Sequence, residues 1–318
     1  KSSQSLNLSY TDPFFTINHV SQTLSAYSNR VNYDKRDLTN YATNSIGASV
    51  LYGVPISDTN TMNLGFGLDH TNLVKPGSST SEAVNQFTDT YGNNFNTYSL
   101  NWGISHNSTN LAYFPTSGSR FDLNTKLAVP GSSLRYYTLN TSYKWYHPVI
   151  GPTTIGLLGG VQYGNGYGNT NELPLYARFY GGGWGSVRGF SEGSMGPHDT
   201  LKDADGNETQ GQVIGGNLNV HLSANFFFPP SLTKNPDSLR LGWFVDAGNI
   251  YSTKKEDYAY QSQDLPTHPS FGNMRYSTGL GLQWYSPVGM MAFSLSKVLN
   301  AKPGDDTSMF NFSIGQTF

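Results

Sequence analysis

The chain has 318 residues, no cysteine, a formal net charge of −2 and 13% charged residues, which is low against the usual ~25%. The absence of cysteine excludes disulfides, thiolate metal sites and a cysteine nucleophile. A net charge of −2 does not provide the excess of basic residues that is typical of nucleic-acid-binding proteins. No run of apolar residues is long enough for a membrane helix.

Segments in which apolar and polar residues alternate recur along the whole chain, which is the pattern of strands with two unlike faces. The clearest case is 120–129, where Phe121, Leu123 and Leu127 oppose Asp122 and Lys126. The predicted strands are 5–10, 20–31, 42–54, 61–73, 95–107, 120–129, 134–147, 152–164, 212–228, 238–250, 273–286, 290–299 and 307–318. Between them we expect a tight turn at 57–60, a polar loop over 74–94 and a structureless loop over about 165–211.

The roughly 13 predicted strands average near 11 residues, the length at which a tilted strand spans a bilayer. Short turns alternate with mostly longer loops, as in outer-membrane barrels. These features predict an all-β fold, a transmembrane antiparallel β-barrel in the bacterial outer membrane, with residues 1–318 as a single domain. Counting strands back from the periplasmic C-terminus places Lys1 on the outer side, so we expect an odd number of further strands before it.

A glycine-rich stretch at 180–190 lies inside the longest predicted loop. Five glycines permit positive φ and close backbone approach. Arg188 is the only charged residue between Arg178 and Glu192. A loop this long in a compact domain is usually functional or disordered. We therefore predict that it folds into the barrel and carries one positive charge to one fixed partner.

The alternation within two later strands indicates where that partner lies. In 238–250, Trp243 and its alternate neighbours form the lipid face, so Asp246 faces the lumen. In 212–228, the lumenal set includes His221, Ser223 and Asn225. We expect Arg188 to bind Asp246, because an arginine–carboxylate pair can be bidentate and geometrically specific.

The last predicted strand ends the chain with a row of apolar residues on one face. Phe310, Phe312, Ile314 and Phe318 share the lipid face, and Gly315 lies opposite. An aromatic at the end of a lipid-facing strand is typical of the aromatic girdle of such barrels.

The chain resembles the BamA family of outer-membrane protein assembly factors, in the superfamily that includes TamA and the two-partner-secretion transporters. The resemblance covers the whole chain and rests on Val187-Arg188-Gly189-Phe190, which is similar to the family's VRGF motif, and on motifs that follow in family order. These are YTDPFF at 10–15, YFPTSGSR at 113–120, FVDAG at 244–248, LQWYSP at 282–287 and the terminal strand 310–318.

The resemblance implies a barrel of about sixteen strands preceded by POTRA domains, of which this chain would supply strands 4–16. It implies that the motif belongs to an inward-folded sixth loop, that Asn225 stands where the family has a glutamate, and that the last strand carries a β-signal and half of a lateral gate. The implied function is insertion of client β-barrel proteins, with outer-membrane lipid and accessory lipoproteins of the BAM complex as partners. No cofactor, metal or catalytic residue is implied, and a two-partner-secretion or TamA-like barrel is the alternative.

Other classes of protein are less consistent with these patterns. His221, Ser223 and Asn225 would suit an enzyme, but residues i, i+2 and i+4 of any strand share a face. The glycine-rich loop lacks the strand–loop–helix context of a phosphate-binding loop. Residues 203–208 lack the spacing of a calcium loop, and we expect an exposed acidic turn there. A porin would line an open lumen with charges, whereas this lumenal face is mainly Gly, Ser, Asn and Thr.

Overall fold

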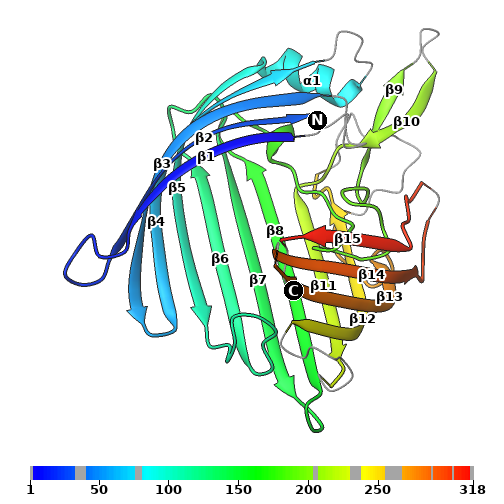
Figure 1. Ribbon diagram of the computed structural model, residues 1–318. Helices are drawn as coiled ribbons and strands as arrows, with labels where there is room; N and C mark the ends of the chain where they lie inside the picture. The colour runs from blue at the N-terminus through cyan, green and yellow to red at the C-terminus, as the bar shows by residue number, and fades with distance from the viewer. Residues whose placement is uncertain are drawn as a thin grey trace.

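The computed structural model describes residues 3–32, 41–75, 81–202, 207–229, 238–254, 267–287, 289–302 and 304–315. Thirteen strands form one sheet in the order β1 to β8 followed by β11 to β15, and all neighbours pair antiparallel (Figure 1). The predicted number of strands is thus confirmed. The strands are β1 (Ser3–Asp12), β2 (Ser21–Asn32), β3 (Ala42–Ser57), β4 (Asn60–Val74), β5 (Asn94–Asn107), β6 (Gly118–Ala128), β7 (Tyr136–Pro148), β8 (Thr154–Gly166), β11 (Leu218–Phe227), β12 (Leu239–Tyr251), β13 (Arg275–Ser286), β14 (Gly289–Val298) and β15 (Phe310–Ile314).

The two faces of the sheet differ as the alternation predicts. On β12, Trp243 is 47% exposed, whereas Phe244 and Asp246, on the opposite face of the strand, are buried. Leu64 and Trp102 are likewise exposed on the convex side. Large apolar side chains on the outside of a curved sheet, with polar ones inside, are what a hydrocarbon surrounding requires.

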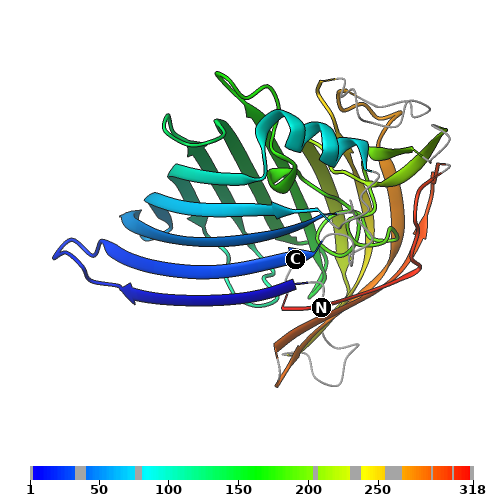
Figure 2. The same ribbon diagram turned by 90° about the horizontal axis from the view of Figure 1, so that it is seen from above.

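The sheet curves into an incomplete cylinder whose two ends are β1 and β15 (Figure 2). Among the described residues no ladder joins these two strands. In lipid the unpaired N–H and C=O groups of an edge need a partner. That further strands precede Lys1 stays a prediction.

The connections sort to the two ends of the cylinder. The two-residue connection between β3 and β4 lies at one end, here called the tight-turn end. The helix α1 (Glu82–Tyr91) and the hairpin of β9 (His198–Lys202) and β10 (Glu208–Val213) lie at the other, the long-loop end (Figure 1). This arrangement agrees with the predicted alternation of short and long connections.

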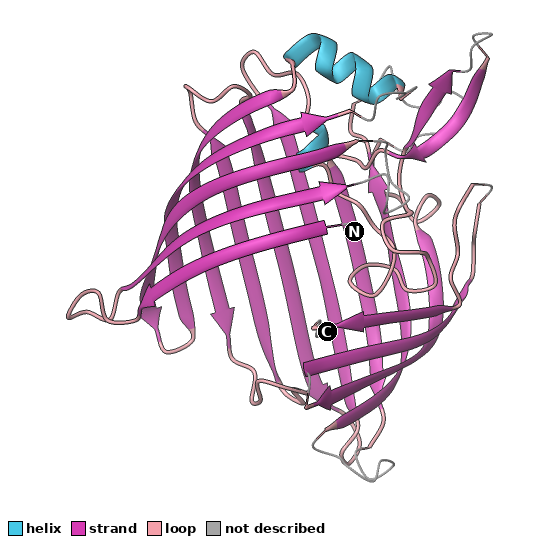
Figure 3. Cartoon of the chain, turned by 45° about the horizontal axis from the view of Figure 1, so that its top comes forward, coloured by secondary structure: helices cyan, strands magenta, loops and turns pink. Residues whose placement is uncertain are grey.

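Helix α1 corrects the predicted polar loop over 74–94 (Figure 3). Ser81 begins the helix by accepting a hydrogen bond from the Val84 N–H at 3.2 Å. Ala83, Val84 and Phe87 are buried while the rest of the helix is largely polar. The helix was missed because its sequence resembles a loop and only packing defines its apolar face. None of the described helices is long and apolar enough to cross a membrane.

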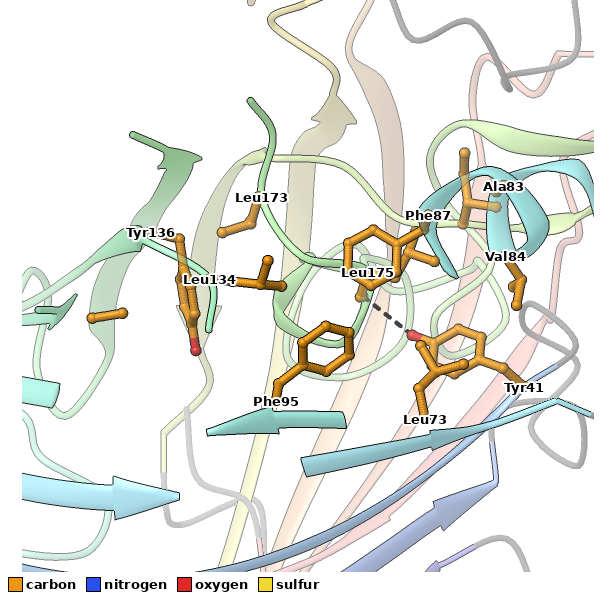
Figure 4. Close-up of a cluster of buried hydrophobic side chains, with 12 residues drawn as sticks. Tyr41, Leu73, Ala83, Val84, Phe87, Phe95, Leu134, Tyr136, Leu173 and Leu175 are labelled. Carbon is orange, nitrogen blue, oxygen red and sulfur yellow. Dashed lines mark hydrogen bonds between the residues drawn. The ribbon is translucent and has the colours of Figure 1, made fainter. Parts of the chain in front are cut away.

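A buried apolar cluster lies at the long-loop end of the cylinder (Figure 4). It joins α1 to the strands and to the long loop between β8 and β11, and the Tyr41 hydroxyl donates to the Leu175 carbonyl at 3.1 Å. Each fully buried large side chain contributes roughly 1.5–3 kcal/mol. The cluster consists of Tyr41, Leu73, Ala83, Val84, Phe87, Phe95, Ala128, Leu134, Tyr136, Leu173, Leu175 and Ile214.

The long loop is also more ordered than predicted. It contains the 3₁₀ helix η2 (Leu175–Ala177) and the β9–β10 hairpin, so the structureless loop over 165–211 was wrong in this respect. Because 208–213 pairs in this hairpin, β11 begins at Leu218 rather than at 212. Residues 203–206 of the predicted acidic turn lie outside the described residues.

The carboxyl group of Asp199 joins this hairpin to the N-terminus of α1. It accepts hydrogen bonds from the Ser81 hydroxyl, from the Ala83 N–H at 3.1 Å and from the Thr200 N–H at 2.8 Å. The side chain is 1% exposed. Burial raises the pKa of the Asp199 carboxyl to about 6, and the three donated hydrogen bonds offset only part of that effect.

We expect the contact between α1 and the hairpin to weaken as pH rises. The pKa of Asp199 in the docked form, about 6, lies above the value of about 3.9 in an unfolded chain. The docked form therefore binds more protons than the unfolded chain between these two pH values. The stabilisation from the protonated carboxyl, about 2–3 kcal/mol, is fully present below about pH 4 and is lost as pH rises through 6. Spin labels on cysteines at positions 90 and 210 should show a narrower distance distribution at pH 4.5 than at pH 7.5. Asp199→Asn should remove this difference, and an unchanged difference would contradict the assignment.

Candidate functional site

The motif Val187–Phe190 lies inside the cylinder, in a backbone conformation that needs glycine. Gly189 has φ +95°, and a Cβ placed there would lie 3.1 Å from Val298 Cγ2 and 3.2 Å from Ser296 Cβ. Val187 and Phe190 are fully buried beside Ile250. A larger residue at 189 would be strained and would push the loop away from β14.

Arg188 makes the predicted contact with Asp246. Nη2 donates to Oδ1 at 2.6 Å and Nε donates to Oδ2 at 2.7 Å, the bidentate geometry of a strong pair. The Arg188 backbone N–H also donates to Oδ2 at 3.0 Å. The two side chains are 1% and 0% exposed. Both the charge and the backbone of the motif are therefore held by one carboxylate on β12.

Strand β11 completes the surroundings of this pair. Nη2 of Arg188 also donates to Ser223 Oγ at 2.9 Å and to Asn225 Oδ1 at 3.1 Å. Asn225 thus contacts the arginine as expected, and it does so as a neutral hydrogen-bond acceptor through its amide oxygen. The β11–β12 register places Ser223 opposite Asp246, and its hydroxyl donates to Oδ1 at 2.6 Å. The pair is neutral overall, so no uncompensated charge is buried.

Aromatic rings form the rest of the arginine's environment. The guanidinium carbon lies 3.4 Å from the centroid of the Phe244 ring and 5.3 Å from that of Trp184. An arginine over an aromatic face gains a further cation–π attraction, which is larger in a desolvated site. Phe244 comes from the lumenal face of β12 and Trp184 from the loop itself.

Asn311 on β15 is a partner of the motif that sequence reasoning missed. Its Oδ1 accepts from the Gly189 N–H at 2.9 Å, and its Nδ2 donates to the Phe190 carbonyl at 3.2 Å. The Ser308 N–H donates to the Gly189 carbonyl at 2.9 Å. A polar residue alternating with Phe310 and Phe312 was the available signal, because such a residue must face the lumen.

These contacts also explain why β15 is shorter than the predicted strand 307–318. Thr307 forms a bridge with Phe190, and the Ser191 N–H donates to the Asp306 carbonyl at 3.1 Å. The residues before Phe310 thus pair partly with the loop rather than continuing the sheet. The end of the predicted strand, residues 316–318 with Phe318, lies outside the described part of the chain.

The apolar row of β15 faces outwards as expected. Phe310, Phe312 and Ile314 are 53%, 44% and 60% exposed. The rings of Phe310 and Phe312 lie 6.4 and 5.0 Å from that of Phe293 on β14. Gly315 has φ +80° and its N–H donates to the Met290 carbonyl at 2.7 Å. The last described strand therefore presents an aromatic outer face, while its inner face holds the loop.

Comparison with known proteins places these features in a family. Residues 1–318 match the Omp85 superfamily domain. The chain is 33% identical to the outer membrane protein assembly factor BamA of Neisseria meningitidis serogroup B, over 98% of this chain and 41% of that protein. It therefore spans less than half the length of this relative.

Solved structures agree with the sequence match. BamA from Haemophilus ducreyi lacking POTRA domains 1–3 is similar with a TM-score of 0.88 at 31% identity, over 98% of this chain and 61% of that one. CdiB from Acinetobacter baumannii shares only the fold, with a TM-score of 0.53 at 13% identity, over 98% of this chain and 49% of that one.

Proposed function

The chain belongs to the Omp85 superfamily, and on that premise we propose that it is the membrane barrel of an assembly factor that inserts other β-barrel proteins into the bacterial outer membrane. The observation that carries the proposal is the buried contact between the loop motif and Asp246, in a barrel 33% identical to a named assembly factor. The 13% identity to CdiB supports the secretion-type alternative less well.

In the proposed mechanism the loop sets the position of the last strand. Asp246 holds one side of the motif and Asn311 holds the other, so β12 and β15 are linked through the lumen as well as through the sheet. The link limits how far β15 moves away from its neighbours. A lateral gate would use the side of β15 that has no partner strand among the described residues, and its other half would come from the strands that we predict before this sequence.

A client strand would add to that free edge by β-augmentation. Main-chain hydrogen bonds supply the affinity and need little side-chain information. The described part of β15 has five residues and offers a short edge to a partner strand. A short span of this kind thins the nearby bilayer, which eases insertion. Unfolded β-barrel proteins and outer-membrane lipid are the proposed partners, with accessory lipoproteins bound through POTRA domains outside this sequence. The mechanism needs no enzymatic step or cofactor, because client folding itself supplies the free energy.

The full-length protein in liposomes tests this function. A purified unfolded β-barrel client, mixed without nucleotide, should fold several times faster than in protein-free liposomes, scored by its altered gel mobility without heating. Equal rates in the two preparations, or a strict requirement for ATP, would contradict the proposal. Release of the client into the liposome interior would favour the secretion-type alternative instead.

A further inference from the structure

The turn between β5 and β6 crosses the lumen near the tight-turn end and forms one wall of a partly open cavity. The Pro115 carbonyl accepts a hydrogen bond from Arg240 Nη2 at 2.8 Å, across the cylinder on β12. The Tyr113 ring lies 4.6 Å from that of Tyr285 on β13. The cavity behind the turn has a volume of about 170 Å³, enough for about six water molecules at roughly 30 Å³ each.

Three positive side chains line this cavity, and among the described residues one carboxylate, that of Asp122, pairs with one of them. Arg120, Lys144 and Arg240 belong to β6, β7 and β12. Asp122 pairs with Arg120 at 2.8 Å. Within the described ranges, neither Lys144 nor Arg240 has an ion-pair partner. Counted over the described residues, the cavity lining therefore carries more positive than negative charge.

Arg240 is 8% exposed, and its positive charge is only partly balanced by the described residues around it. Its guanidinium carbon lies 3.4 Å from the centroid of the Phe227 ring and 5.6 Å from that of Tyr146. Its one hydrogen bond to the described residues goes to the Pro115 carbonyl, and a guanidinium group has five N–H donors, so further donors can serve a ligand. A buried cation without an anion is costly, so an anion that enters gains a strong partner.

The remaining walls combine polar side chains, Asn107, Thr109 and Gln283, with an apolar and aromatic part that bears on the kind of anion. Leu111, Tyr146 and Met290 line the space beside the cations. A free phosphate would satisfy the charges but leave this surface in contact with water. An organic acid would satisfy both, because its body would displace that water.

We propose that the cavity, which no part of the assembly mechanism uses, binds a carboxylate carried on an apolar body. Arg240 and Lys144 donate to the carboxylate oxygens, and Leu111, Tyr146 and Met290 contact the body. Two sources have this chemistry, a free small acid and the C-terminal end of a peptide. Binding does not depend on the proposed function and can be measured without any client protein.

The test is titration calorimetry on the full-length protein in detergent. The probes are 3-phenylpropionate, N-acetyl-Ala-Ala-Phe with a free carboxyl end, the amide of the same peptide, and inorganic phosphate. We expect the free peptide to bind at least about tenfold more tightly than its amide, because a charged hydrogen-bond acceptor is lost. Tighter binding of the peptide than of 3-phenylpropionate identifies a chain end as the ligand, and the reverse order identifies a small acid.

Three variants localise the binding. Arg240→Gln and Lys144→Gln should each weaken the binding of the carboxylate by about tenfold. Lys297→Gln removes the same charge from an exposed position on β14 and should leave it unchanged. Lys144 is only partly buried, so its variant remains informative if Arg240→Gln does not fold. Equal binding of the acid and the amide, phosphate binding as tight as the best carboxylate, or full binding by Lys144→Gln would overturn the proposal.

Discussion

An Arg188→Ala substitution should lower the free energy of unfolding by about 3–5 kcal/mol, because it leaves the carboxylate of Asp246 buried without a partner. The same change should release the loop and reduce client insertion. Urea unfolding of the full-length protein in lipid vesicles measures the first effect, and the liposome assay measures the second. Arg120→Ala is the matched control. Arg120 is 51% exposed in its pair with Asp122, so its loss should cost less than about 1 kcal/mol.

A double substitution separates stability from position. Arg188→Met with Asp246→Leu removes both charges and should recover most of the lost stability, since apolar replacement of a buried pair is often neutral. Client insertion should stay low, because the bidentate contact and the hydrogen bond that the backbone N–H of residue 188 donates to the carboxylate are both absent. Full insertion activity in this variant would show that the contact serves stability alone.

An Asn311→Ala substitution should free the motif from β15. The Gly189 N–H and the Phe190 carbonyl would lose their partner in a buried site, at a cost of about 2–4 kcal/mol for the two groups. Hydrogen exchange at Gly189 should accelerate by at least about tenfold, while the amide of Arg188, bonded to Asp246, should change less.

Ser313→Ala is the control for this second prediction. Ser313 lies two residues further along β15, on the same face, and no side-chain hydrogen bond is present for it among the described residues. Its replacement should leave exchange at Gly189 unchanged. Equal exchange rates in Asn311→Ala and the unaltered protein would mean that the loop is held without β15.

The local pattern of the sequence was sufficient to predict most of the sheet. Strand number and face follow from a two-residue period that each strand carries by itself. The same period placed Asp246 and Asn225 in the lumen, and the resemblance of Val187–Phe190 to a known motif directed Arg188 towards them. The structure shows these contacts at 2.6 and 3.1 Å. The roles of these residues in assembly stay predictions.

The features that only the tertiary structure decided are those in which one segment packs against a segment distant in the sequence. Helix α1 has a polar sequence, and only the cluster around Phe87 and Leu175 defines its buried face. In the sequence Asn311 is one of several polar residues, and only its contacts with the loop beside β15 distinguish it. The cavity exists because the turn at Pro115 crosses to Arg240. Periodicity is encoded by neighbouring residues, whereas the placement of the motif loop depends on side chains 35 to 122 positions away, and no local pattern contains that information.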